Sequence, residues 1–217
     1  MTGKNEDLRR NVLNELAWDP SVDATHIGVA ADNGVVTLTG HVATYAEKLA
    51  AERATKRVVG VRGIAEAIEV RPPHAKKTKD DEIAERAVRI LQWDVSVPSE
   101  RISVKVEKGW VTLSGDVDWD YQRGAAAADI QKLSGVVGLI NLIAVKPAVR
   151  AADVRQKIED AFRRTAALDA SEIRVLAVDG TVKLEGYVRS WAERNTAERA
   201  AWSAAGVTAV EDHLLVG

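Results

Sequence analysis

The sequence predicts an α+β protein of three tandem αββαβ modules, each a three-stranded mixed sheet with two helices on one face. The segments 8–70, 83–145 and 154–216 align without a gap when the chain is shifted by 75 and then by 71 residues. Each segment repeats the same order of apolar patterns, first helical and then alternating. A fixed period of this length indicates repeated small domains. Three glycine positions coincide, at Gly34, Gly109 and Gly180, at Gly40, Gly115 and Gly186, and at Gly60, Gly135 and Gly206.

The first helix of each module is predicted by apolar residues that recur every four positions. In the first module, Leu8, Val12 and Leu16 lie on one face of such a helix. Apolar residues then alternate, as in Ile27 and Val29, which predicts a strand with one buried face. The equivalent residues are Ile83, Ala87, Leu91, Ile102 and Val104 in the second module, and Val154, Ile158, Phe162, Ile173 and Val175 in the third.

A two-residue turn joins the first predicted strand to the second. Asn33-Gly34 supplies the positive φ that a tight hairpin turn needs. The following strand, VVTLTGHV, places Val36, Leu38 and Val42 on its buried face. The other two modules have Lys108-Gly109 and Asp179-Gly180 at this turn.

The second helix begins with a capping box in the first and third modules, where side-chain oxygens bond to the free amides of the first turn. The second module has Trp119 and Gln122 at these positions, so we expect Asp118 to cap its helix. Each second helix ends near a glycine, which favours a left-handed C′ residue. A final apolar strand closes each module. The capping boxes are Thr44 with Glu47 and Ser190 with Glu193.

Prolines and a short basic run mark the segments between the modules. Lys76, Lys77 and Lys79 are followed by acidic residues. This pattern is typical of a solvated linker, with contact to an acidic surface as the alternative. The modules are expected at 7–70, 82–145 and 153–216, and the linkers at 71–81 and 146–152.

Composition narrows the class of protein. The 217-residue chain has a net charge of −2, and each aligned segment has one acidic residue more than it has basic residues. Nucleic-acid binding requires a basic excess, so no nucleic-acid partner is expected. There is no cysteine, no apolar signal core at the N-terminus and no run of 18 apolar residues. We expect a cytoplasmic protein that can be peripheral to a membrane, with the periplasm as the alternative if a signal was removed.

The strand and turn residues resemble the BON domain family (bacterial OsmY and nodulation). The first module carries the similarity in GVVTLTGHV at 34–42, in Asp19-Pro20 and in Gly60-Val61. The second module keeps GWVTLSGDV at 109–117, and the third departs most, with GTVKLEGYV at 180–188. The resemblance implies an αββαβ fold and a non-enzymatic role, usually phospholipid or membrane-surface attachment under osmotic or envelope stress. It implies no catalytic residues.

No pattern of catalytic or metal-binding residues recurs in the modules. His26, His41, His74 and His213 occupy unrelated module positions, and none has the spacing of a metal-binding helix. The sequence also lacks a nucleophile elbow and a phosphate-binding loop. We therefore expect no enzyme activity, no cofactor and no metal site.

A polar residue recurs on the last strand, where alternation predicts an apolar one. The three residues are Glu66, Asn141 and Asp212. A bulge, a strand edge or a bond to nearby backbone would explain them. The alternative is a ligand for a hard cation, because alkali and alkaline-earth ions prefer oxygen ligands. Cation sensing is therefore the weakest functional alternative.

Aromatic residues are the candidate contact sites for a lipid or a partner. Tyr45, Trp119, Tyr121 and Trp191 lie at the starts of second helices, where amides also attract anions such as lipid phosphate. Trp202 stands where the sister modules have polar residues. Packing between modules or in an oligomer, insertion at a membrane interface, and incidental exposure remain alternatives.

The sequence thus predicts a non-enzymatic binding protein whose partner is a phospholipid headgroup or membrane surface. The alternative is a structural or stress-protective module that binds proteins through exposed tryptophans and does not bind lipid.

Overall fold

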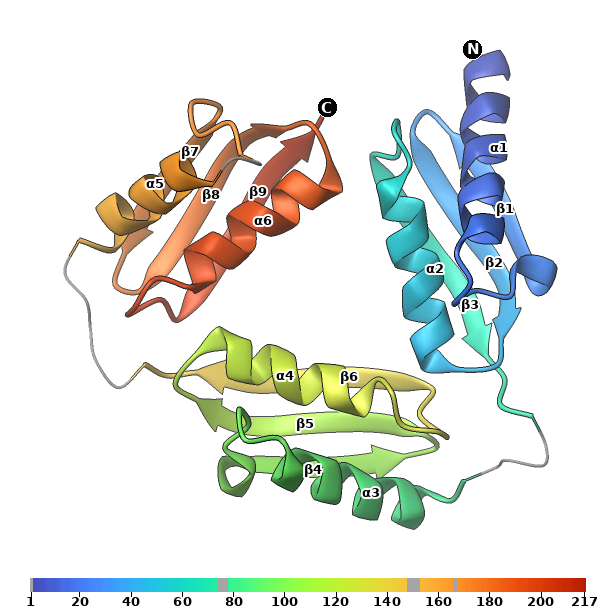
Figure 1. The fold of residues 1–217 in the computed structure, drawn as a ribbon, viewed down its shortest axis with the longest axis horizontal. Helices are drawn as coiled ribbons and strands as arrows, with labels where there is room; N and C mark the ends of the chain where they lie inside the picture. Colours follow the sequence, from blue (N-terminus) through green and yellow to red (C-terminus); the bar gives the residue numbers. More distant parts are fainter. Residues whose placement is uncertain (1, 74–77, 148–152, 166–167) are drawn as a thin grey trace. The chain divides into compact units, whose positions relative to one another are not determined.

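The predicted fold class is confirmed by the computed structural model, which describes residues 2–73, 78–147, 153–165 and 168–217. In these ranges the chain forms six α-helices and three three-stranded sheets, arranged as three αββαβ modules (Figure 1). His74, Lys76, Lys77 and most of the second predicted linker lie outside the described residues.

Each module presents the same five elements in the same order. The first contains α1 (Thr2–Trp18), β1 (Ile27–Asp32), β2 (Val35–Val42), α2 (Tyr45–Arg57) and β3 (Gly63–Val70). The second contains α3 (Asp80–Trp93), β4 (Ile102–Glu107), β5 (Trp110–Val117), α4 (Asp120–Ile130) and β6 (Gly138–Val145). The third contains α5 (Val154–Arg164), β7 (Ile173–Val178), β8 (Thr181–Val188), α6 (Trp191–Trp202) and β9 (Ala209–Val216).

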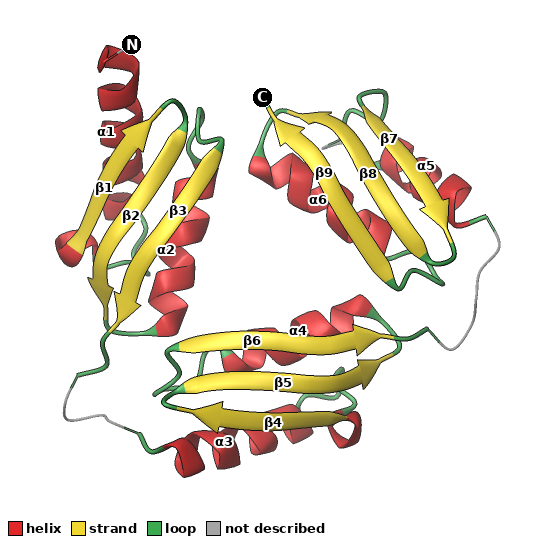
Figure 2. Cartoon of the chain, turned by 180° about the vertical axis from the view of Figure 1, so that it is seen from behind, coloured by secondary structure: helices red, strands yellow, loops and turns green. Residues whose placement is uncertain are grey.

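The second strand of each module lies in the centre of its sheet. In the first module, β1 runs antiparallel to β2, with Ile27 opposite Gly40, and β3 runs parallel to β2, with Glu66 beside Leu38. The third module has the same pairings. Figure 2 shows both helices of each module behind its sheet. One face of each sheet is therefore covered by its helices, and we term the other the open face.

The core of each module lies between the covered face and the helices. In the first module, Val12 and Leu16 from α1 meet Val36 and Leu38 from β2, and all four are fully buried. Burial of such a side chain contributes roughly 1.5–3 kcal/mol. In the third module, Phe162 fills the equivalent place on α5.

One glycine in each central strand permits a close approach between backbones. A Cβ atom on Gly40 would lie 1.9 Å from the carbonyl oxygen of His26, and φ of Gly40 is +110°. Gly115 has φ +130°, and its Cβ would lie 2.0 Å from the carbonyl oxygen of Arg101. Gly186 repeats this arrangement. Only glycine combines this φ with this contact, which explains the second coinciding glycine of the repeat.

We predict that Gly115→Ala destabilises the second module by roughly 2–4 kcal/mol, because the new methyl group must displace backbone and φ is unfavourable for alanine. Gly124→Ala is the matched control. Its Cβ would meet nothing within 4 Å in α4, so this change should stabilise the module by up to about 1 kcal/mol. Hydrogen exchange of β5 amides measures both effects. Equal protection in the two variants would contradict the close approach.

The loop after α1 is held by the carboxylate of Asp19. One oxygen accepts hydrogen bonds from the amide and the hydroxyl of Ser21, at 3.0 and 2.5 Å. The other accepts from Arg57 Nη2 at 2.8 Å. These bonds, with those from Ser21 the largest cause, lower the pKa of Asp19 from 3.8 to about 2. The ionised carboxylate is therefore favoured in the folded state.

A depressed carboxyl pKa contributes stability that is present above the unfolded pKa of 3.8 and is lost as pH falls through about 2. We predict that Ser21→Ala raises the pKa of Asp19 toward 3.8 and removes part of this contribution above pH 4. NMR titration of the carboxyl carbon measures the shift. Ser203→Ala is the control, because its hydroxyl donates to the Arg199 carbonyl in the third module. An Asp19 titration unchanged by Ser21→Ala would disprove the assignment.

Candidate functional site

The second helices of the first and third modules begin with the predicted capping boxes. Thr44 Oγ1 accepts a hydrogen bond from the Glu47 amide at 3.1 Å, and Glu47 Oε2 accepts from the Ala43 amide at 3.0 Å. Glu47 Oε1 also accepts from the Asp23 amide at 2.8 Å, so this side chain ties the loop before β1 to the helix start. Ser190 and Glu193 make the same contacts in the third module, with the Asp169 amide in place of the Asp23 amide.

The second module caps its helix through Gln122, and the expectation of Asp118 as the cap is wrong. Gln122 Oε1 accepts hydrogen bonds from the amides of Asp118 and Trp119, at 3.1 and 3.0 Å. The Asp118 carboxylate instead accepts from Arg101 at 3.1 Å. Pro98 occupies the position of Asp23 and has no amide hydrogen. The hydrogen bond that Glu47 accepts from the Asp23 amide in the first module therefore has no counterpart here.

The topology brings the end of the first helix and the start of the second helix to the same end of a module. Asp80, at the start of α3, accepts hydrogen bonds from the amides of Lys108 and Gly109 in the hairpin turn. A Cβ on Gly135, just after α4, would lie 3.0 Å from Ile83 of α3. The hairpin, the start of α3 and the end of α4 therefore share one end. The end of α3 and the start of α4 lie at the other (Figure 1).

Exposed apolar side chains occupy this second end of the second module. Trp93 ends α3 with 85% of its surface exposed, and Val95 after it is fully exposed. Trp119, just before α4, is 39% exposed, and Tyr121 in its first turn is 61% exposed. We term these four residues the aromatic end. They form the candidate functional site, because large exposed apolar residues grouped together mark contact surfaces.

The other candidate aromatic residues, Tyr45, Trp191 and Trp202, are each half-buried. Tyr45 begins α2 and is half-buried, although Trp18 at the corresponding end of the first module is 82% exposed. Trp191 is half-buried, and the Arg194 guanidinium lies 5.2 Å from its ring centroid. Trp202 is the last residue of α6, so it lies at the opposite end of that helix, where it packs against the module core.

Sequence reasoning therefore found Trp119 and Tyr121 but missed Trp18 and Trp93, the two most exposed tryptophans. The signal for these two was present in the repeat. They occupy the same module position, and the third module has Arg164 there, a residue that is rarely buried.

The charged groups beside the aromatic end neutralise one another. Arg101 forms ion pairs with Asp116 and, at 3.1 Å, with Asp118. The hydrogen bond from Arg101 holds the pKa of Asp116 below its ordinary value, and the same bond raises the pKa of Arg101. Arg123 pairs with Asp120 in the first turn of α4. The site thus presents aromatic surface beside paired charges.

A sequence profile of the BON domain matches residues 4–72, 79–147 and 150–217. The chain belongs to the BON domain family. Each of the three matches corresponds to one of the αββαβ modules, so the aromatic end is a feature of the second BON domain.

Known proteins provide further comparisons. Osmotically-inducible protein Y of Escherichia coli (strain K12) is 30% identical over 131 residues, which are 58% of this chain and 65% of that protein. The chain thus matches less than two thirds of its relative's length. Two structures of CdsD, a structural protein of the type III secretion system of Chlamydia trachomatis, are 15% and 16% identical. They cover 97% of this chain, and 92% and 98% of the CdsD chains, with a TM-score of 0.27. A score this low supports no argument about this chain.

The recurring oxygens on the last strands of the BON domains bond to nearby backbone. Glu66, Asn141 and Asp212 each accept a hydrogen bond from the amide two residues further along the chain. Glu66 also pairs with Lys48 at 2.8 Å, and Asp212 pairs with Arg194 at 2.7 Å. A side-chain cation thus already accompanies both carboxylates, and the backbone-bonding interpretation is confirmed.

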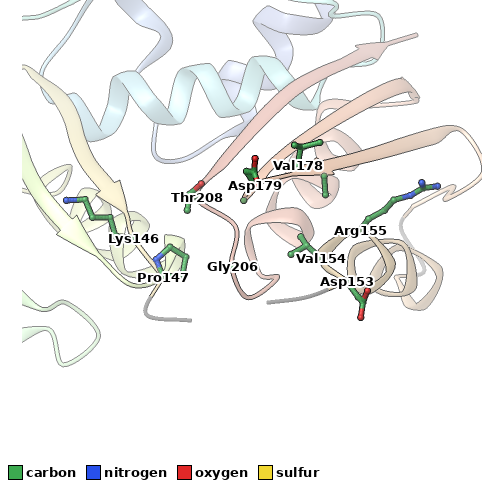
Figure 3. A pocket seen from close by; sticks show the side chains of 11 residues that line it. Lys146, Pro147, Asp153, Val154, Arg155, Val178, Asp179, Gly206 and Thr208 are labelled. Atoms are coloured by element: carbon green, nitrogen blue, oxygen red, sulfur yellow. The ribbon is translucent and has the colours of Figure 1, made fainter. Parts of the chain in front are cut away.

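Among the described residues, the hairpin end of the third BON domain does not provide a comparable group of exposed aromatic residues. A hollow beside the hairpin of the third BON domain is lined there by Val154, Arg155, Asp179 and Thr208, which spread from separate elements (Figure 3). The described residues contain no group of three histidine or acidic side chains that could hold a metal ion. None of the helices among them has both the length and the apolar content of a membrane-spanning segment.

We predict that Trp93→Ala changes the free energy of unfolding by no more than about 0.5 kcal/mol, because the side chain is 85% exposed and supports no core. The same change should shift the average tryptophan emission to shorter wavelength, since a water-exposed emitter is lost. Leu91→Ala, two residues earlier and buried, should cost roughly 2–5 kcal/mol. Urea denaturation followed by far-UV circular dichroism compares the variants. A large loss of stability in Trp93→Ala would show that Trp93 belongs to the core.

Proposed function

We propose that this protein is a non-enzymatic BON-domain protein that attaches to the surface of phospholipid membranes through the aromatic end of its second domain. The observation that carries the proposal is the exposure of Trp93, Val95, Trp119 and Tyr121 at one end of a small domain. Indole and phenol rings prefer the headgroup layer, because one part of each ring is apolar and another forms hydrogen bonds. This chemistry favours shallow insertion over deep burial.

The energy available from shallow insertion is sufficient for reversible binding. A fully buried tryptophan removes about 150–250 Å² from water, which is worth at most ~4–6 kcal/mol at ~25 cal/mol per Å². Trp93 can contribute a large part of this value, and Trp119 less, since most of it is already covered. Two or three such side chains offset the cost of restricting the domain at a surface.

Charge contributes little to the proposed attachment. The chain carries a net charge of −2, and Arg101 and Arg123 are paired with aspartates beside the aromatic end. A polybasic segment gains about 1 kcal/mol per cation at an anionic surface, and no such unpaired cluster supports this site. We therefore expect binding that depends weakly on salt.

The similarity to an osmotically inducible protein supports a role during osmotic stress. For the compartment, the periplasmic alternative is compatible with this relative, whereas the cytoplasmic expectation receives no support from it. Phospholipid headgroups are accessible from either compartment, so the proposed attachment does not depend on this choice.

Protein–protein association is the second candidate function. It is favoured by the open face of the second sheet, where Trp110 and Ile140 are about half exposed and line one shallow hollow with Lys105 and Thr112. This surface lies on the sheet, whereas the aromatic end lies at the ends of the helices. Variants of Trp110 therefore distinguish the two functions.

Co-sedimentation with phosphatidylglycerol and phosphatidylethanolamine vesicles tests the proposed function. We predict that the full chain sediments with the vesicles and that most binding persists from low salt to about 0.5 M salt, where the Debye length is only a few Å. The triple variant Trp93→Ala, Trp119→Ala, Tyr121→Ala should lose binding. Trp110→Ala is the matched control and should bind like the wild type.

Three outcomes would contradict the proposal. The first is that the wild type fails to sediment at low salt. The second is that the triple variant binds as well as the wild type. The third is that Trp110→Ala loses as much binding as the triple variant. The last result would favour the open face, and with it the second candidate function. Circular dichroism of each variant confirms that it is folded.

A further inference from the structure

Two histidines of the first module lie side by side at one end of its open face. His26 ends the short 3₁₀ turn before β1, and His41 is the next-to-last residue of β2. Their ring centroids are 4.6 Å apart, and the ring planes differ by 13°. His41 is also adjacent to Glu69 on β3.

The backbone, rather than the rings, fixes this pairing. Gly40 allows the carbonyl of His26 to approach the central strand, as described above. The register Ile27 opposite Gly40 then places residues 26 and 41 next to each other across the strands. The two imidazoles are therefore neighbours in any rotamer, because both start from backbone held in the sheet.

The same pair of positions has a different chemistry in the second module. There Arg101 and Asp116 replace the two histidines and form an ion pair. These two positions can thus hold a pair of opposite charges in the second module, whereas in the first module both are occupied by histidine. In the described part of the chain, neither imidazole has a hydrogen bond from its ring nitrogens. Nearby carboxylates already have partners, with Glu69 bonded to Arg71 and Asp23 to the Thr25 amide.

We propose that His26 and His41 bind one transition-metal ion, such as Cu²⁺, Ni²⁺ or Zn²⁺, through one nitrogen of each ring. Neutral imidazole is a preferred ligand of these metals, with metal–nitrogen distances of about 2.0–2.1 Å for zinc. His26 is exposed and His41 is half-buried. Exposed side chains change rotamer within nanoseconds, so the His26 ring can turn from the stacked arrangement until a lone pair of each ring points at one ion. Water completes the coordination, since no third protein ligand is grouped with them among the described residues.

A site with two imidazoles and water ligands has a predictable selectivity. It follows the Irving–Williams order, so Cu²⁺ binds more tightly than Ni²⁺ or Zn²⁺. Hard cations such as Ca²⁺ and Mg²⁺ prefer oxygen ligands and should not compete. The two histidines belong to the first module and the aromatic end to the second, so the metal site does not depend on the proposed lipid attachment.

Titration of the full chain with CuCl₂ in a non-coordinating buffer, followed by NMR of the histidine rings, tests the proposal. The first equivalent of Cu²⁺ should broaden the ring signals of His26 and His41 before those of His74 and His213. The double variant His26→Arg, His41→Asp copies the ion pair of the second module. It should remain folded and lose the strongest binding component, measured in parallel by titration calorimetry. His213→Asn is the control and should retain it.

The proposal would be overturned by any of three results. The first is that Cu²⁺ broadens the ring signals of all four histidines in parallel. The second is that the double variant keeps the strongest Cu²⁺-binding component. The third is that His213→Asn loses that component. Addition of Ca²⁺ in excess provides the selectivity control, and displacement of Cu²⁺ by Ca²⁺ would also contradict a bis-imidazole site.

Discussion

The close approach of two backbones at one glycine supports the rest of each module. Gly40 and Gly115 have positive φ angles, and a Cβ on either would overlap a carbonyl oxygen of the residue before the first strand. This contact fixes the register of the first two strands. The register in turn places Val36 and Leu38 on the covered face and His41 on the open face. Core and surface are thus set by a position that has no side chain.

Comparison of the three modules shows which residues depend on one another, because the same backbone positions carry different side chains with different partners. Where the last strand has a carboxylate, at Glu66 or Asp212, the second helix supplies a cation that pairs with it. Where the last strand has Asn141, its amide bonds to the Arg123 carbonyl instead. Surface chemistry therefore changes between modules in coupled pairs while the backbone is retained.

The fold was predictable from the sequence because its determinants are local and are repeated three times. Coinciding glycines, alternating apolar residues and the capping boxes of Thr44 and Ser190 each correspond to an observed element. The cap of the second module was mispredicted because the Asp118 carboxylate can either cap the helix or pair with a cation. Its carboxylate pairs with Arg101, whose position depends on tertiary structure, and the Gln122 side chain bonds to the amides of Asp118 and Trp119 just before the helix.

The candidate site was predicted only in part. Helix starts can be located from sequence, so Trp119 and Tyr121 were found. Trp93 was missed, because it joins them only once the antiparallel helices place the end of α3 beside the start of α4. Exposure is likewise a property of the packed module. Trp191 resembles Trp119 in sequence position, yet it is half-buried beside Arg194.

The central claim is that the aromatic end of the second module enters the headgroup layer of a membrane. The most direct test is ¹⁹F NMR of the full chain labelled with 5-fluorotryptophan, with vesicles that carry a spin label at the lipid headgroup. The account predicts strong broadening of Trp93 and Trp119, while Trp110 is broadened much less, because it begins β5 beside the hairpin turn at the opposite end of the same module. Resonances of Trp93 and Trp119 that stay as sharp as that of Trp110 would contradict it.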